Sequence, residues 1–155
     1  MYRLRPEDIP LANDILLPYL NSLSARCDAL EEAEQLVTSL LSATNDFLID
    51  KHLEFSARKD GVRIVTDDGQ DLDPIQLSSG ERQLVMLVCT AILAGRDTRL
   101  LLIDEPELSL GVAWQRRVLE SLLSLTKGSS LQFVVATHSI EIISSQLDYL
   151  VPLSR

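Results

Sequence analysis

Two apolar runs of the chain end in residues that could act on a phosphate group. The run at 100–103 ends in Asp104 and Glu105, and the run at 131–136 leads directly into Thr-His-Ser, which contains His138. In an open α/β sheet a ligand lies off the carboxyl ends of the strands, so Glu105 and His138 are expected at one edge of one sheet. Neighbouring acids suit two tasks there, because one carboxylate can hold Mg²⁺ while the other activates a water. We therefore expect Asp104 to be a metal ligand and Glu105 a general base.

His138 has a matching role in this interpretation. An imidazole can donate a hydrogen bond to a γ-phosphate oxygen and so respond to its presence. Each signal also has a plainer interpretation: residues 100–105 could be a buried strand that runs into an acidic turn, and His138 could be a structural residue with satisfied hydrogen bonds. Ser139 could simply cap the helix that follows it. A third interpretation makes Asp104, Glu105 and His138 ligands of a metal ion that acts without a nucleotide.

The segment 77–83, Leu-Ser-Ser-Gly-Glu-Arg-Gln, has the composition of an anion-binding helix start. Ser78 and Glu81 have the spacing of a capping box, which would begin a helix whether or not it binds anything. Free N–H groups at that end attract anions, and Gly80 lets the backbone approach closely. We expect the Ser78 hydroxyl and the Gly80 amide to contact a phosphate. Ser79 and Glu81 belong to the same predicted binding turn.

The elements that must position these residues alternate along the rest of the chain. Residues 52–57 and 62–65 flank a turn and predict a β-hairpin. A helix is expected from Gly80, with Gly95 as a helix-ending residue. The alternation predicts an α/β fold in which helices flank a parallel sheet in three layers, with its first strand buried on both faces. Its elements are expected in the order strand 100–103, helix 112–126, strand 131–136, helix 140–145 and strand 149–151.

The first 50 residues are expected to form a separate helical segment. Residues 8–28 and 29–48 each carry apolar side chains at helical spacing, and Pro18 could kink or divide the first stretch. We expect a packed pair of helices in 1–50 and the rest of the fold in 51–155. A role in dimerisation or partner docking is the alternative for these helices.

Composition narrows the class of protein. The chain has 155 residues, of which 46% are hydrophobic, and a net charge of -9. Clustered Lys and Arg supply most non-specific affinity for nucleic acid, so contact with DNA is expected only indirectly, through a partner. No apolar run is long enough to cross a membrane and the first residues lack a signal-peptide pattern, so we expect no membrane contact and a cytoplasmic location. Cys27 and Cys89 lack metal-type spacing and are expected to be buried free thiols in a reducing compartment.

The order of these motifs resembles the ATP-binding-cassette (ABC) ATPases, and among them the RecF-like, OLD-like, AAA_21-like and chromosome-maintenance (SMC) proteins. Residues 77–83 look like the signature motif of that family, residues 100–105 like its Walker B strand, and His138 like its switch histidine. Glu107-Leu-Ser-Leu is similar to the segment that becomes the D-loop. The resemblance covers about residues 45–155.

This resemblance implies part of an ATPase that uses ATP and Mg²⁺. The P-loop NTPase-like fold would be the C-terminal lobe of an ABC-type domain, in a head-to-tail dimer where the signature of one subunit closes over ATP held by another. Ser109 would make a contact at that interface. The chain departs from the family at Gly111, where RecF-like and OLD-like relatives commonly carry histidine followed by proline. The phosphate-cradling Walker A loop, G-x-x-x-x-G-K-[ST], occurs nowhere in the 155 residues.

The missing loop implies that the isolated chain does not hydrolyse ATP. We expect the C-terminal half of a longer or split ATPase, completed by a second copy or by a partner chain that supplies Walker A. Family analogy suggests a process in DNA maintenance or anti-phage defence. The alternative from another functional class is a non-catalytic interaction or regulatory module derived from such an ATPase.

Overall fold

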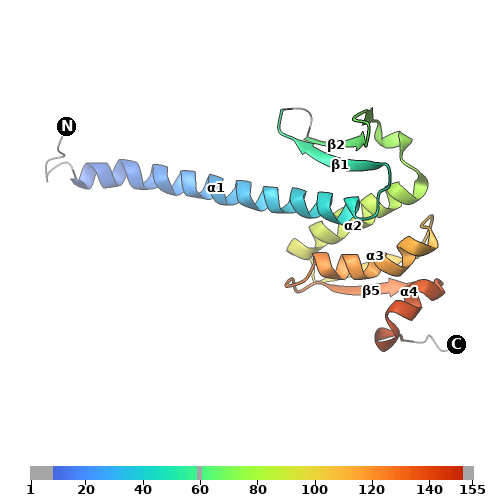
Figure 1. Ribbon diagram of the computed structural model, residues 1–155. Coiled ribbons are helices and arrows are strands. Elements are labelled where there is room, and N and C mark those ends of the chain that lie inside the picture. Colours follow the sequence, from blue (N-terminus) through green and yellow to red (C-terminus); the bar gives the residue numbers. More distant parts are fainter. Residues whose placement is uncertain (1–8, 59–60, 152–155) are drawn as a thin grey trace. The chain divides into compact units, whose positions relative to one another are not determined.

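The structure of the protein is a computed structural model that describes residues 9–58 and 61–151 (Figure 1). Contacts between residues divide the chain into two units, the first ending at Val37 and the second beginning at Thr38. The boundary between the units therefore lies inside helix α1 (Ile9–Asn45), whereas the expected boundary at residue 50 lies beyond the end of that helix. Of the helices in the described ranges, none combines the length and apolar character needed to span a membrane.

Helix α1 spans Ile9–Asn45 without interruption, so the expected pair of helices is wrong. Pro18 lies inside the helix. A proline removes only one backbone donor, and a helix of 37 residues retains its remaining hydrogen bonds. Side chains 16–35 are all exposed, including those of Leu16, Leu20 and Leu30. Cys27 is among them, so the expectation that this thiol is buried is wrong.

The second unit contains the expected hairpin. Strands β1 (Lys51–Ser56) and β2 (Gly61–Thr66) pair antiparallel, and the short strand β3 (Asp71–Leu72) adds to β2. Leu53 and Ile64 face each other in the ladder and form a small buried cluster with Leu77. This sheet therefore has its own apolar core.

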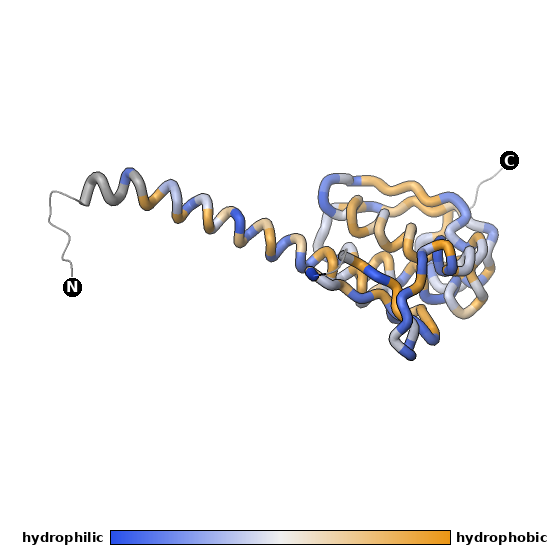
Figure 2. The backbone as a smooth tube through the Cα atoms, turned by 90° about the horizontal axis from the view of Figure 1, so that it is seen from above, coloured by the Kyte–Doolittle hydropathy of each residue, from blue (hydrophilic) through white to orange (hydrophobic). Residues whose placement is uncertain are grey.

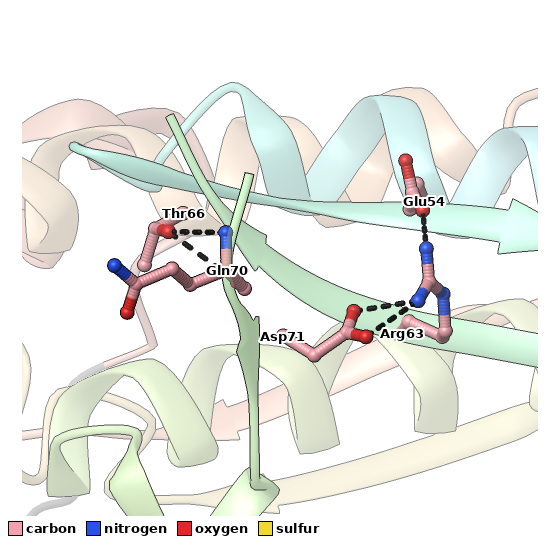
Figure 3. Close-up of polar contacts among 5 residues, drawn as sticks. All are labelled: Glu54, Arg63, Thr66, Gln70 and Asp71. Atoms are coloured by element: carbon pink, nitrogen blue, oxygen red, sulfur yellow. Dashed lines mark hydrogen bonds and ion pairs between the residues drawn. The ribbon is translucent and has the colours of Figure 1, made fainter. Parts of the chain in front are cut away.

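Charged side chains bind the three strands of this sheet together (Figure 3). Arg63 lies opposite Glu54 in the ladder, forms an ion pair with it, and reaches Asp71 of β3 with Nη1 to Oδ1 at 2.6 Å. Next to this group, the Gln70 N–H donates to the Thr66 hydroxyl at 3.0 Å and closes the turn before β3. One guanidinium thus ties both outer strands to the central strand.

A second sheet holds the predicted Walker B and switch segments. Strands β4 (Leu100–Asp104) and β5 (Gln132–Ala136) pair parallel, as expected for a strand, helix, strand unit. Helices α2 (Ser79–Asp97), α3 (Val112–Leu125) and α4 (Ile140–Ser145) follow the predicted order, with α2 ending two residues beyond Gly95. The expected α/β alternation of strands and helices is therefore confirmed.

The main core lies between these helices and one face of the β4–β5 sheet. Helix α2 contributes a stripe at spacings of three and four, which is the side of a helix that faces a core. Figure 2 colours the backbone by hydropathy, and the apolar stretches of the second unit are orange. The buried residues of the helices include Leu84, Leu87, Val88, Ala91, Val118, Leu122 and Ile142, with Leu101, Ile103, Phe133 and Val135 of the strands packed against them.

The opposite face of the β4–β5 sheet is not covered by the described residues, so the expectation that β4 is buried on both faces is wrong. Leu102 is 68% exposed, and Leu100 and Val134 on the same face are also exposed. Helices pack on only one side of the two strands here. An apolar run in the sequence looks the same whether this chain or another one covers its second face.

The expected strand at 149–151 is also absent. A 3-10 helix, η3, occupies Leu147–Tyr149 instead, and Leu150 and Val151 are exposed without pairing to β5. Three apolar residues that lead into a proline make a weak strand, because proline cannot donate to a ladder. The described part of this sheet therefore has two strands.

Candidate functional site

The structure brings Glu105 and His138 together. The register of the parallel strands pairs Asp104 with Ala136, and the Glu105 N–H donates to the Ala136 carbonyl at 2.8 Å, which extends the pairing one residue past β4. His138 Nε2 then lies 3.8 Å from Glu105 Oε1. The imidazole is 91% exposed and the carboxylate 41%, so both can reach a ligand at this edge of the sheet.

The loop after β4 has an unusual backbone. Glu105 has φ of +47° and Ser109 has φ of +64°, both in the left-handed region that residues with a Cβ rarely adopt. The Leu108 N–H donates to the Glu105 carbonyl and the Leu110 N–H to the Glu107 carbonyl, so the loop is held as two successive turns. The left-handed turn at Glu105 gives its side chain a different direction from those in the strand.

Asp104 is exposed at the end of β4, where its carboxylate is available to a ligand. Within the described ranges, no three His, Cys, Asp or Glu residues are grouped so that they could hold a metal ion. This result contradicts the interpretation in which Asp104, Glu105 and His138 bind a metal without a nucleotide. A metal ion at Asp104 would need other oxygen ligands from a substrate or from water.

Glu107 is the functional candidate that the sequence analysis missed. Its Oε1 accepts hydrogen bonds from the backbone N–H groups of His138 at 2.8 Å and Ser139 at 3.0 Å. Burial raises the pKa of this carboxyl, but hydrogen bonds from the Thr137 side chain and from backbone N–H groups outweigh it and hold the pKa below the usual glutamate value. Glu107 lies 31 residues before His138, so no local pattern could reveal the contact.

Ser139 occupies the capping position anticipated for it. Its hydroxyl accepts from the Ile142 N–H at 3.2 Å, which begins α4, and donates to Gln115 Oε1 at 2.8 Å. Gln115 Nε2 in turn donates to the Leu110 carbonyl at 2.8 Å. Gln115 therefore bridges the loop after β4 and the loop after β5.

The predicted signature turn forms the capping box that its sequence indicates. The Ser78 hydroxyl accepts from the Glu81 N–H at 3.2 Å, and Glu81 Oε2 accepts from the Ser78 N–H at 2.7 Å. Lys51 Nζ of β1 lies 2.9 Å from Glu81 Oε1, so both oxygens of this nearly buried carboxylate have partners inside the protein. Ser78 and Ser79 are exposed and can reach a ligand.

Burial and hydrogen bonding act in opposite directions on Glu81. Burial raises the pKa of its carboxyl, but the Ser78 N–H and the Lys51 ammonium outweigh that effect, and the pKa lies below its ordinary value. Glu81 is therefore an anion at neutral pH, fixed to the start of α2.

Gly80 is buried against the loop after β4. A Cβ at this position would lie 2.4 Å from the Ser109 carbonyl oxygen, closer than any real contact of that kind. The absence of a side chain is thus required by packing inside the chain, in addition to any role in approach to an anion. The contact brings two of the predicted site residues, Gly80 and Ser109, together.

Residues 3–144 match the AAA_21 family model, described as "AAA domain, putative AbiEii toxin, Type IV TA system". The chain belongs to this family. Among curated proteins, it is 38% identical over 81 residues to the lipoprotein-releasing system ATP-binding protein LolD of Ruegeria pomeroyi, covering 52% of this chain and 34% of LolD. The LolD 1 protein of Rhodospirillum rubrum is 42% identical over 84 residues, covering 54% and 35% of the two chains.

Solved structures give the same fold. The SMC head domain from Thermotoga maritima superposes with a TM-score of 0.54 at 20% identity, over 78% of this chain and 44% of that one. An SMC head bound to the C-winged helix domain of ScpA gives a TM-score of 0.55 at 21% identity, over 72% and 36% of the two chains. The α/β, P-loop NTPase-like fold expected from the sequence is thus confirmed, and this AAA_21 chain spans about a third of the length of the LolD proteins.

Proposed function

We propose that this AAA_21 chain supplies the hydrolytic edge and the signature turn of an ABC-type ATPase that works as a head-to-tail dimer or with a partner chain. One observation carries the proposal: Glu105 and His138 lie 3.8 Å apart at the carboxyl ends of two neighbouring parallel strands. A ligand site is expected at that edge of such a sheet. The family relationship makes ATP the ligand to test first.

Within this proposal the three residues of the edge have separate tasks. Glu105 orients the attacking water and accepts its proton, and His138 donates a hydrogen bond to a γ-phosphate oxygen. Asp104 fits Mg²⁺ because its exposed carboxylate is a hard oxygen ligand, and Mg²⁺ usually keeps waters and phosphate oxygens as its remaining ligands. When bound, Mg²⁺ would neutralise charge on the phosphates.

The signature turn would act on a nucleotide held by another chain. The exposed Ser78 and Ser79 hydroxyls and the N–H groups at the start of α2 form a surface suited to phosphate oxygens. Gly80 and Ser109 would belong to the same contact surface through their packing against each other. Glu81 would support the turn through its capping box, since both of its oxygens are already engaged.

The free edge of β5 supports the need for a further chain segment. Gln132 N–H and the Ala136 carbonyl bond toward the β4 side, and the bonding direction alternates along a strand. Phe133 and Val135 therefore direct their backbone groups to the opposite edge, where no described strand lies. A groove of about 530 Å³ beside these residues runs between β5, α3 and α4. We propose that a segment carrying the Walker A loop completes this sheet, and that the assembly acts in the cytoplasm in DNA maintenance or anti-phage defence.

The uncovered sheet face also favours a second candidate function. Leu102 and its exposed neighbours could dock a partner without any turnover of nucleotide, since no phosphate-cradling loop occurs in the sequence. In that case the chain would be an interaction or regulatory module.

Phosphate release by a purified complex separates these candidates. The chain is co-expressed with a fragment from the same genome that carries a G-x-x-x-x-G-K-[ST] loop. Glu105→Gln should lower phosphate release by about 100-fold or more while ATP binding by calorimetry is retained, because only proton transfer is lost. The exposed Glu120 of α3 offers the matched control, Glu120→Gln, which should leave release unchanged. A stable complex that binds no ATP would favour the interaction module, and normal release from Glu105→Gln would exclude Glu105 as the base.

A further inference from the structure

Glu107 connects the two loops that carry the proposed catalytic pair. It lies in the loop between β4 and α3, and its Oε1 accepts from the consecutive backbone N–H groups of His138 and Ser139, at 2.8 and 3.0 Å. Hydrogen bonds to an ionised carboxylate are about twice as strong as neutral ones. The contact therefore fixes the backbone on which the His138 imidazole stands.

The His138 side chain has little support of its own. It is 91% exposed, and its Nε2 lies 3.8 Å from Glu105 Oε1. The direction of its imidazole thus depends on the backbone of residues 137–139. The Glu107 carboxylate holds that backbone from another loop, and Gln115 Oε1 accepts from the Ser139 hydroxyl at 2.8 Å.

The loop that carries Glu107 is also held by hydrogen bonds. Glu107 shares its loop with Glu105, and the Leu108 N–H donates to the Glu105 carbonyl at 3.1 Å while the Leu110 N–H donates to the Glu107 carbonyl at 2.9 Å. These two turns fix the backbone of Glu107 relative to that of Glu105. The distance between the loops is therefore set by a short, hydrogen-bonded path.

We propose that Glu107 is a positioning residue that sets the separation of His138 from Glu105. The carboxylate touches neither a reacting atom nor a ligand in this scheme, and it acts through the backbone of the switch loop. Its kinetic consequence rests on the proposed ATPase function, but the structural part does not. A purely structural role, such as stabilising the start of α4, is the competing explanation.

Backbone amide resonances of the isolated chain test the structural part. In a 15N-labelled sample, the amides of His138 and Ser139 should shift together with pH, with a midpoint below the ordinary glutamate range, since both donate to one carboxylate. Glu107→Gln should abolish this shared titration and keep the fold, because an amide oxygen can still accept and Gln115 still bridges the loops. Glu120→Gln should leave the titration in place. Amides that do not titrate, or that still titrate in Glu107→Gln, would overturn the proposal.

Kinetics of the hydrolysing complex separate positioning from stability. Glu107→Ala, which removes both hydrogen bonds, should lower kcat by about tenfold to 100-fold with an unchanged KM for ATP, as expected when catalytic groups are misplaced by a fraction of an ångström to an ångström. Glu107→Gln, whose amide oxygen can still accept, should retain more of the activity. A normal kcat would refute the proposal, and so would a loss of kcat matched by loss of folded protein. If no complex hydrolyses ATP, the proposed function fails, whereas the amide titration still decides whether Glu107 holds the loop.

Discussion

The two sheets of the second unit differ in how far they are completed by their own chain. In the β1–β2–β3 sheet, Leu53 and Ile64 are buried opposite each other, and Arg63 binds both outer strands. In the β4–β5 sheet, one face packs on helices, and the other exposes Leu102. The proposed catalytic residues stand on the second sheet. The sheet whose three strands are joined by Arg63 thus acts as a support, and the sheet with an open face carries the proposed catalytic residues.

Matched truncations in the two sheets should give the largest difference. Ile64→Ala removes buried methyl groups and should lower the free energy of unfolding by about 2–4 kcal/mol. Leu102→Ala, at a side chain that is 68% exposed, should cost less than about 1 kcal/mol. Urea denaturation of both variants measures the two values. Equal losses would mean that the open face of β4 is covered in solution, and the contrast between the sheets would disappear.

The start of α2 is the point where both sheets are braced. Gly80 packs on the loop after β4, and Glu81 pairs with Lys51 of β1. Changes at these two neighbours therefore test each brace separately.

Gly80→Ala should destabilise the chain by about 1–3 kcal/mol, because the new Cβ would lie 2.4 Å from the Ser109 carbonyl and force the loop to move. Gly95→Ala in the same helix is the matched control. Its Cβ would meet Thr126 at an ordinary 3.4 Å, so the alanine should stabilise the helix by up to about 1 kcal/mol. Thermal unfolding of the two variants should shift in opposite directions. The same shift in both would show that helix propensity, not the Ser109 contact, governs position 80.

Lys51→Met should have a smaller, pH-dependent effect of about 1–2 kcal/mol at pH 7, through loss of a hydrogen bond to a charged group. The pKa of Glu81 is lowered in the folded state, so its ionisation stabilises the protein above the unfolded pKa, and this contribution is lost as pH falls through the folded pKa. The difference between variant and parent should thus shrink below about pH 4, near the ordinary glutamate value. The exposed Lys127 provides the control Lys127→Met. A difference that is constant from pH 7 to pH 3 would argue against the ion pair.

The elements with local signals were predictable from the sequence. The hairpin, the strands that end at Asp104 and Ala136, and the three helices of the second unit lie within a few residues of their expected bounds. Apolar runs bounded by turn residues carry this information locally. The capping box at Ser78 was equally readable, because its two partners are three residues apart.

The features that were not predicted depend on contacts between residues far apart in the sequence or on the length of an element. Pro18 is a local signal for a helix break, but α1 continues through it. The role of Glu107 depends on a contact across 31 residues, and Gly80 is constrained by Ser109 rather than by its own turn. No pattern in a single sequence reports such pairs. The open face of β4 was missed because hydrophobicity does not say which chain will cover it.

The left-handed backbone at Glu105 and Ser109 lowers the stability of the folded protein. Each such residue costs on the order of 1 kcal/mol relative to glycine, which adopts the same angles without strain. A glycine at 105 would thus make a more stable protein that lacks the proposed base. Screens for heat-resistant variants are expected to enrich glycine or asparagine at these two sites. Such enrichment would indicate that the residues present there serve a function other than folding.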